Sequence, residues 1–205
     1  MVLGLGWGTA SVLRLGSAAQ RHAVWAATFA ALPVLPFFAL QCGPAIALDV
    51  PWIPVVWAVG FALCIVPLAR GLMALERLRR AATPDPSQPG LLHSDAVPGP
   101  LTWGLFRPVI LLPTEAASWT RSQRAAALAH ERAHVRRRDW AVHLAVWIVS
   151  AVFWFHPLVW VARRALAREA EHAADDAVLA DGIRPSDYAS LLVSLAGGGP
   201  PRAAL

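Results

Sequence analysis

Two histidines and a glutamate near the middle of the chain have the spacing of a metal-binding motif. Residues 119–139 read WTRSQRAAALAHERAHVRRRD, and His130 and His134 lie four positions apart with Glu131 between them. On an α-helix this spacing places both imidazoles on one face, where they can share one zinc ion, with Glu131 beside them to activate a water. The alternative is a solvated face of an arginine-rich helix. The H-E-x-x-H pattern therefore needs a third ligand.

An acidic stretch further along the chain offers that ligand. Residues 168–179 read REAEHAADDAVL, and Glu171 and Asp175 are four residues apart on a predicted helix that ends at Asp181-Gly182. Glu171 is the candidate third zinc ligand. Asp175 is the candidate acceptor for a ligand imidazole N–H. An exposed acidic helix face, which would include Glu169, is the alternative.

The intervening sequence must return Glu171 to the two histidines. Thr120 and Gln123 form a possible capping box, which predicts a helix from about Arg121 to Arg138. A break follows, with Asp139 as the N-cap of the next helix.

A turn is predicted at His156-Pro157, because proline disfavours helix in the residue before it. At 1.5 Å per residue, the arm from Asp139 to Phe155 is about 24 Å long and the arm from Pro157 to Glu171 about 21 Å. Two antiparallel arms of nearly equal length bring Glu171 back to the level of the histidines.

The composition predicts a membrane protein. Hydrophobic residues make up 57% of the chain, charged residues 15%, and the mean hydropathy is +0.49, which is too apolar for an ordinary soluble domain. Residues 23–40 and 52–69 are uncharged runs long enough to span a bilayer. Arginines flank this pair of spans, while Asp49 is the charge between them, so the positive-inside rule predicts cytoplasmic flanks. The net charge of +5 does not indicate direct nucleic-acid binding, because the arginines do not line one face with interleaved aromatics.

These patterns predict four regions. Residues 1–80 form a membrane anchor, 81–100 a proline-rich linker, 101–195 the zinc peptidase core and 196–205 a flexible tail. At the start of the core, residues 101–113 predict a β-hairpin in which Pro108 restricts the second strand to an edge.

Several motifs in order, between about Ser17 and Leu195, resemble the BlaR/MecR-type antibiotic-sensor membrane peptidases of bacteria. The matching pieces are RHAVW from Arg21, PLTWGLFRPVILLP from Pro100, HERAHVRRRDW from His130, FWFHPLVW from Phe153 and EHAADDAVL from Glu171. The set is far more specific than H-E-x-x-H alone.

The resemblance implies a gluzincin-like site facing the cytoplasm of a multi-pass cell-membrane protein. Its Zn²⁺ ligands would be His130, His134 and Glu171, its base Glu131, and its substrate a cytoplasmic or juxtamembrane protein, with a transcriptional repressor or the protein itself favoured. Ala174 stands where these proteins often have cysteine, and the first span is shorter. The sequence stops before the later span and penicillin-binding sensor of the best-known relatives, so β-lactam sensing is not carried over.

The expected fold is mainly α, with integral membrane helices and a gluzincin-like helical core that carries a small β-hairpin. Two other functions stay open. A housekeeping protease resembling the CAAX-processing and heat-shock zinc peptidases shares H-E-x-x-H followed by E-x-x-x-D. A non-catalytic membrane transducer or scaffold would keep the fold without the chemistry.

Overall fold

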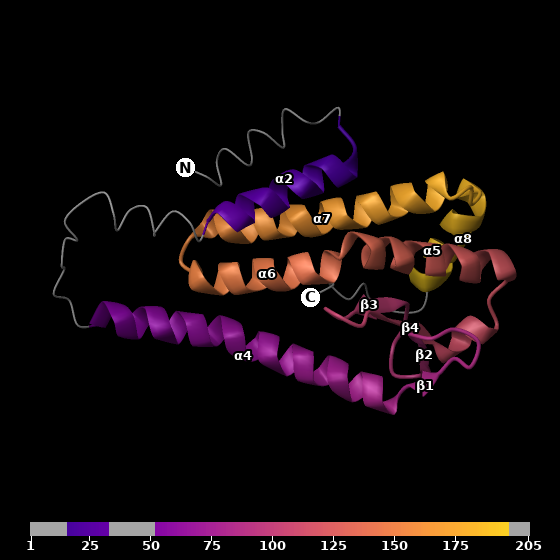
Figure 1. Cartoon of the computed structure of the whole chain (residues 1–205), viewed down its shortest axis with the longest axis horizontal. Helices are drawn as coiled ribbons and strands as arrows, with labels where there is room; N and C mark the ends of the chain where they lie inside the picture. The colour runs from indigo at the N-terminus through magenta and orange to yellow at the C-terminus, as the bar shows by residue number, and fades with distance from the viewer. Residues whose placement is uncertain (1–15, 33–51, 197–205) are drawn as a thin grey trace. The chain divides into compact units, whose positions relative to one another are not determined.

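The computed structural model describes residues 16–32 and 52–196, which form mainly helices and one small sheet (Figure 1). The described elements, in chain order, are α2 (Ala18–Ala31), α4 (Trp52–Ala81), β1 (Thr83–Pro84), β2 (Leu91–Ser94), β3 (Leu101–Trp103), β4 (Val109–Pro113), the 3₁₀ helix η2 (Thr114–Ala117), α5 (Arg121–Arg137), α6 (Asp139–Val152), α7 (Pro157–Ala180) and α8 (Pro185–Ala196). The chain divides into two compact units, Met1–Arg70 with Val142–Glu171 and Gly71–Ala141 with His172–Leu205. The mainly helical class predicted from the sequence is confirmed.

A helical hairpin of α6 and α7 forms the centre of the first unit. Helix α6 ends at Val152 and α7 begins at Pro157, so the predicted turn is confirmed. The two helices run antiparallel, and α2 lies along α7 (Figure 1). Their apolar faces enclose one core, whose buried members are Trp25, Phe29, Leu32, Val146, Val159, Ala162 and Leu166.

Helix α2 is tied to this hairpin at its start. A capping box between Ser17 and Gln20 begins the helix, and Arg21 Nε donates to a carboxylate oxygen of Glu169 at 2.9 Å. The first predicted span, residues 23–40, begins within α2, but its residues 33–40 lie outside the described part of the chain. Trp25 in its described part is 4% exposed, because it packs against the other helices of the unit.

Helix α4 confirms that the second predicted span is helical, and it continues past Ala69 to Ala81. It is long and apolar enough to cross a membrane by length and composition, and only 6% of its apolar window is buried. The absence of a side chain at Gly60 leaves a notch in α4, where the hairpin of the same unit packs. A Cβ added at Gly60 would overlap the indole of Trp154, whose Nε1 donates to the Trp57 carbonyl at 3.2 Å. The Trp57 Nε1 in turn donates to the Val152 carbonyl at 3.0 Å.

The second unit is built on a four-stranded sheet of order β1-β2-β4-β3. Strands β3 and β4 are antiparallel, with Leu101 opposite Leu111, so the predicted hairpin is confirmed. Strand β2 pairs in parallel with β4, placing Leu91 opposite Ile110.

Two expectations about this region were wrong. Residues 81–100, predicted as a linker, supply β1 and β2, because the short apolar run at Leu91 can pair with the exposed edge of β4. Pro108 does not make the second strand an edge strand. It precedes β4, which is central and is bonded on both sides, and the edge position falls to β3.

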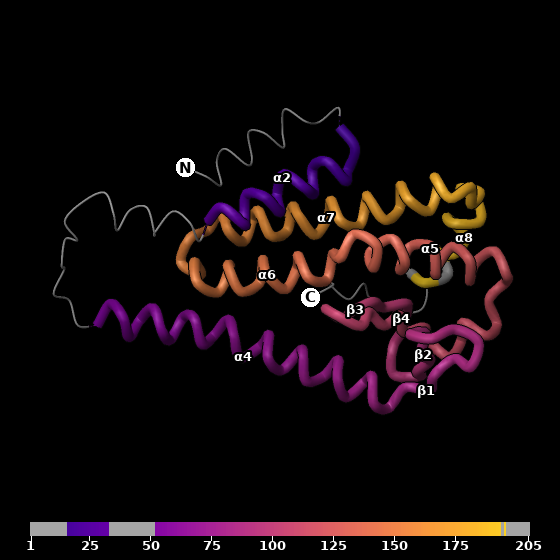
Figure 2. The backbone as a smooth tube through the Cα atoms, viewed as in Figure 1, coloured from indigo at the N-terminus to yellow at the C-terminus, as the bar shows by residue number. Residues whose placement is uncertain are grey.

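Helix α5 packs on the sheet and on α8 within this unit. The side chain of Leu128 joins Leu91 and Leu112 in one cluster, and Ala126 and Ala127 join Tyr188 and Leu191 of α8 in another. Small alanines on α5 allow the close approach of α8, whose existence was not predicted from the sequence. The tube in Figure 2 shows the bend at which α5 ends.

Candidate metal centre

The helix that carries the H-E-x-x-H motif has well-defined ends. Thr120 and Gln123 form the predicted capping box at its start, which is thereby confirmed. At its end Arg138 adopts a left-handed conformation with φ of 56° and donates its backbone N–H to the carbonyls of His134 and Val135. Among the described residues it is the one non-glycine residue with positive φ. This conformation costs about 1–2 kcal/mol for an L-residue, and it ends α5 so that α6 begins immediately afterwards at Asp139.

The bend after α5 places Asp139 against one of the motif histidines. Asp139 Oδ2 lies 2.8 Å from Nδ1 of His134, and Arg137 contributes a guanidinium 3.3 Å from the other carboxylate oxygen. Asp139 is 2% exposed. A carboxylate can only accept, so Nδ1 of His134 is the protonated ring nitrogen.

The other motif histidine is held from α7 and α8. Tyr188 donates its hydroxyl proton to Asp175 Oδ1 at 2.5 Å, and its oxygen lies 2.9 Å from Nδ1 of His130. The Asp175 oxygen is itself 3.2 Å from that nitrogen. Because the tyrosine proton is already given to Asp175, Nδ1 of His130 must be the donor in this network.

The same network perturbs Asp175. Its burial raises the pKa of the carboxyl group, but hydrogen bonds from His130 and Tyr188 outweigh that effect and hold the pKa below its ordinary value of 3.8. Asp175 is therefore a carboxylate at neutral pH, available to accept from its two partners.

With its Nδ1 atom protonated, each imidazole in its neutral form presents the lone pair of its Nε2. These two nitrogens face each other at 3.1 Å, and the ring planes are inclined by 72°. Two facing lone pairs at this distance repel unless a proton or a cation lies between them. The arrangement of His130 and His134 therefore favours a positively charged group at their shared edge.

Glu171 completes a possible ligand set. Ligand atoms of His130, His134 and Glu171 all lie within 4.8 Å of one another. The boundary between the two units falls between Glu171 and His172, inside the unbroken helix α7. Glu171 thus sits one turn before Asp175 on the same helix.

The two alternative acidic ligands are engaged elsewhere. Glu169 pairs with Arg21 at 2.9 Å. Asp175 approaches the Nδ1 side of His130, which is the side of the ring opposite the shared Nε2 edge. Among the acidic residues of this stretch, Glu171 is the one whose carboxylate joins the two histidines.

The residues present fit zinc. Zinc binds histidine nitrogen at about 2.0–2.1 Å with tetrahedral geometry, which separates two ligand nitrogens by about 3.3 Å. The observed separation of 3.1 Å is close to this value without rearrangement of either ring. Two neutral imidazoles and one carboxylate are the ligand set of many catalytic zinc sites, and both imidazoles have the carboxylate or hydroxyl partners that such ligands require.

Glu131 is positioned by the same helical turn as His130. Its side chain is 7% exposed, which is unusual for a glutamate and places it in the interior next to the ligand set. A carboxylate in this position can accept and return a proton beside the ligand set.

Two residues of the site were missed by sequence reasoning. Asp139 was predicted only as an N-cap, although its place five residues after His134 and just beyond a helix end could have signalled its role. Tyr188 lay outside every motif considered, and no local pattern connects it with His130. Its helix α8 had to be folded against α5 before the hydroxyl group met the imidazole.

An H-E-x-x-H helix whose imidazoles converge with a glutamate from a later helix is typical of the metal-dependent peptidases. Comparison with known proteins agrees with that class. The chain belongs to the BlaR1 peptidase M56 family, whose family model matches residues 45–204. The resemblance predicted from the motifs is thereby confirmed.

One curated relative shows the extent of the similarity. Over 89 residues the chain is 33% identical to the regulatory protein BlaR1 of Bacillus licheniformis. The aligned stretch is 43% of this chain and 15% of the relative's length. The similarity therefore concerns a small part of that longer protein.

Proposed function

We propose that this chain is a zinc-dependent membrane endopeptidase whose metal is held by His130, His134 and Glu171. The observation that carries the proposal is the 3.1 Å approach of two Nε2 atoms whose Nδ1 positions are both committed to acceptors. Such ring orientation restricts each histidine to the tautomer that a metal requires. Membership of a peptidase family supports the same reading.

The chemistry is divided between the ion and the chain. When bound, zinc would polarise the scissile carbonyl group and acidify a water. Glu131 takes a proton from the attacking water and later delivers it to the nitrogen of the leaving amine. Asp139 and the pair of Tyr188 and Asp175 hold the imidazoles in place, so little reorganisation is needed during the reaction.

The membrane placement is part of the proposal. Helix α4 crosses the bilayer through its apolar part, and the arginines that follow it mark the cytoplasmic side. The substrate is then a cytoplasmic or juxtamembrane polypeptide, with a transcriptional repressor favoured by the regulatory name of the relative. In a Cys42→Ser, Cys64→Ser background, the exposed position Ala117→Cys should resist an impermeant thiol reagent in intact cells. Labelling there would overturn the cytoplasmic assignment.

The decisive test replaces Glu131 by glutamine. Glu131→Gln keeps the shape of the side chain and removes its basicity, so peptide cleavage should fall by roughly 10²- to 10⁴-fold while zinc content is retained. Glu115→Gln is the matched control, because Glu115 is an exposed carboxylate on η2. The readout is new protein termini in cells that express each variant, together with self-cleavage.

The same experiment separates the peptidase from a membrane transducer or scaffold. If wild type and Glu131→Gln produce the same set of termini, with zinc present in both, the fold is used without catalysis. If Glu131→Gln alone loses them while Glu115→Gln does not, the peptidase is supported.

A further inference from the structure

A cavity of about 210 Å³ lies in the second unit. Its wall combines three chemical features: apolar residues, aromatic rings and two arginines. The lining residues on α4 are Leu72, Leu75, Glu76 and Arg79, and those on the sheet and α6 are Trp103, Gly104, Arg107, Val109 and Trp140. None of the proposed catalytic residues lines it, and the proposed reaction does not use it.

The cavity lies along one face of α4, just beyond the apolar run of that helix. Its four α4 residues recur at intervals of three and four, so they share one helix face. The apolar run of α4 ends at Ala69 and the first charge is Arg70. At 1.5 Å per residue, Leu72 lies about 4 Å beyond that end and Leu75 about 9 Å beyond it. In a spanning helix Leu72 and Leu75 then lie at the headgroup layer, which is roughly 5–8 Å deep on each side. Arg79 begins about 15 Å beyond the end of the run, so its long side chain has to extend back toward that layer.

The charge in the cavity wall is net positive. Arg80 donates to Glu76 at 2.9 Å and compensates its carboxylate. Within the described residues neither Arg79 nor Arg107 makes a side-chain hydrogen bond or an ion pair, and both side chains are exposed. Two arginines without a counter-ion therefore border a space whose other lining residues, apart from the paired Glu76, are glycine, apolar or aromatic.

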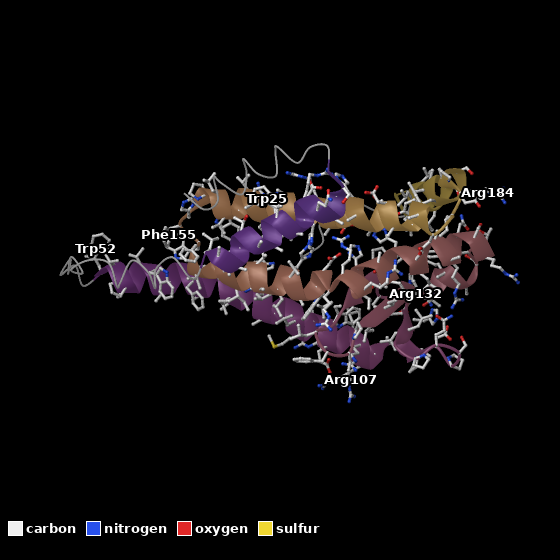
Figure 3. The ribbon with its side chains drawn as sticks, turned by 45° about the horizontal axis from the view of Figure 1, so that its top comes forward. Trp25, Trp52, Arg107, Arg132, Phe155 and Arg184 are labelled. Atoms are coloured by element: carbon white, nitrogen blue, oxygen red, sulfur yellow. The ribbon has the colours of Figure 1, made fainter. Side chains whose placement is uncertain are left out.

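The turn between β3 and β4 adds an apolar projection beside the cavity. Gly104 has φ of 119°, and a Cβ there would lie 2.6 Å from the Arg107 carbonyl oxygen, so the turn closes tightly and needs glycine. The turn presents Phe106 at 91% exposure and Leu105 at 48%. Figure 3 shows Arg107 extending outward at this turn. A rigid turn that holds phenylalanine and leucine in the open, next to arginine, is suited to a membrane interface.

We propose that this cavity binds the headgroup of an anionic phospholipid, with Arg79 and Arg107 on the phosphate and Leu105 and Phe106 inserted at the base of the acyl chains. The inference rests on the membrane placement of α4 proposed above. Guanidinium groups pair well with phosphate oxygens, and the two tryptophans of the wall offer the amphipathic surface found at bilayer interfaces. An acidic peptide or a free phosphate would satisfy the arginines but would leave Leu105 and Phe106 exposed to water, so the lipid is the better occupant.

The test uses the full chain in mild detergent with equal amounts of phosphatidylglycerol and phosphatidylcholine, and counts retained lipid by native mass spectrometry. Wild type should retain phosphatidylglycerol in preference to phosphatidylcholine. Arg79→Gln/Arg107→Gln should reduce the preference by about twenty-five-fold, because each arginine near a lipid surface contributes about fivefold. The control Arg121→Gln/Arg184→Gln removes the same charge from exposed positions outside the cavity and should keep the preference.

Three further results are informative. Phe106→Ser, at an exposed position that cannot disturb the core, should weaken retention of both lipids while leaving the preference in place. Competition by free glycerol phosphate at equal concentration would show that the cavity is a site for soluble anions and would overturn the lipid proposal. An unchanged preference in Arg79→Gln/Arg107→Gln would also overturn it. Incorporation into nanodiscs of phosphatidylcholine alone tests the span of α4 separately, so failure of the headgroup site and failure of the membrane placement are distinguished.

Discussion

The carboxylate of Asp139 lies 2.8 Å from Nδ1 of His134, across the bend that joins α5 to α6. Because Asp139 is almost fully buried and is paired with Arg137, it is a fixed acceptor rather than a mobile surface group. The left-handed Arg138 between the two elements makes this contact possible. The C-terminal end of α5 therefore both terminates the helix and orients His134.

Asp139→Asn should weaken zinc binding by roughly 10- to 100-fold, because the amide no longer holds His134 in one tautomer. Competition with a chelator of known affinity measures the change. Asp181→Asn is the control, since Asp181 is exposed and lies 3.9 Å from Arg136 in a loose ion pair. Equal zinc affinity in wild type and Asp139→Asn would show that the contact does not serve the metal.

The ligand role of Glu171 is tested against its neighbour Glu169. Glu171→Ala should lose most of its zinc, as His134→Ala does, because an open catalytic site depends on three protein ligands. Glu169→Ala should keep about one zinc per chain while losing its ion pair with Arg21. Elemental analysis of purified protein reads the stoichiometry. Zinc loss in Glu169→Ala and retention in Glu171→Ala would reverse the assignment.

Acid stability should depend on Asp85, which lies just after β1. Hydrogen bonds from the Ser87 hydroxyl group and from His93, followed by the Ser87 backbone N–H, hold the pKa of Asp85 far below its ordinary value of 3.8, and Arg124 lies 3.1 Å away. The unfolded chain therefore binds the proton first as the pH falls. The contribution of Asp85 to stability is complete above about pH 5 and is lost progressively as the pH drops below the ordinary value.

Asp85→Asn should remove that part of the acid dependence. The melting temperature of the variant should be lower than that of wild type at neutral pH, and the difference should shrink between about pH 5 and pH 3. Asp95→Asn, in the same unit, provides a comparison carboxylate. A constant difference between wild type and Asp85→Asn over this range would contradict the prediction.

The notch at Gly60 predicts a packing defect in the first unit. Gly60→Leu places a side chain where the Trp154 indole now lies, which should cost about 1–3 kcal/mol and break the hydrogen bond from Trp154 to the Trp57 carbonyl. Thermal unfolding in detergent measures the loss. Ala62→Leu, two residues along the exposed surface of the same helix, should have little effect. Similar melting temperatures for Gly60→Leu and wild type would show that α4 does not dock through this notch.

Local patterns in the sequence were sufficient for the elements and the motif. The capping box at Thr120, the turn before Pro157 and the apolar helix after Trp52 depend on interactions within a few residues, and each lies where it was predicted. The pairing of His130 with His134 is of the same kind, since helical periodicity alone brings them together. The family could also be recognised from the sequence, because its motifs are contiguous stretches.

Contacts between distant segments could not be obtained in this way. The strand at Leu91 pairs with β4 although β3 lies between them in the chain, and Tyr188 contacts His130 from a helix that no motif predicted. Such contacts depend on which apolar faces bury one another, and many pairings satisfy the same local pattern. The sequence alone therefore determined helices α4 to α7, the two histidines and the family. The tertiary structure decided which imidazole Asp175 meets and added Asp139 and Tyr188, because these partners become neighbours of the histidines only after the chain packs.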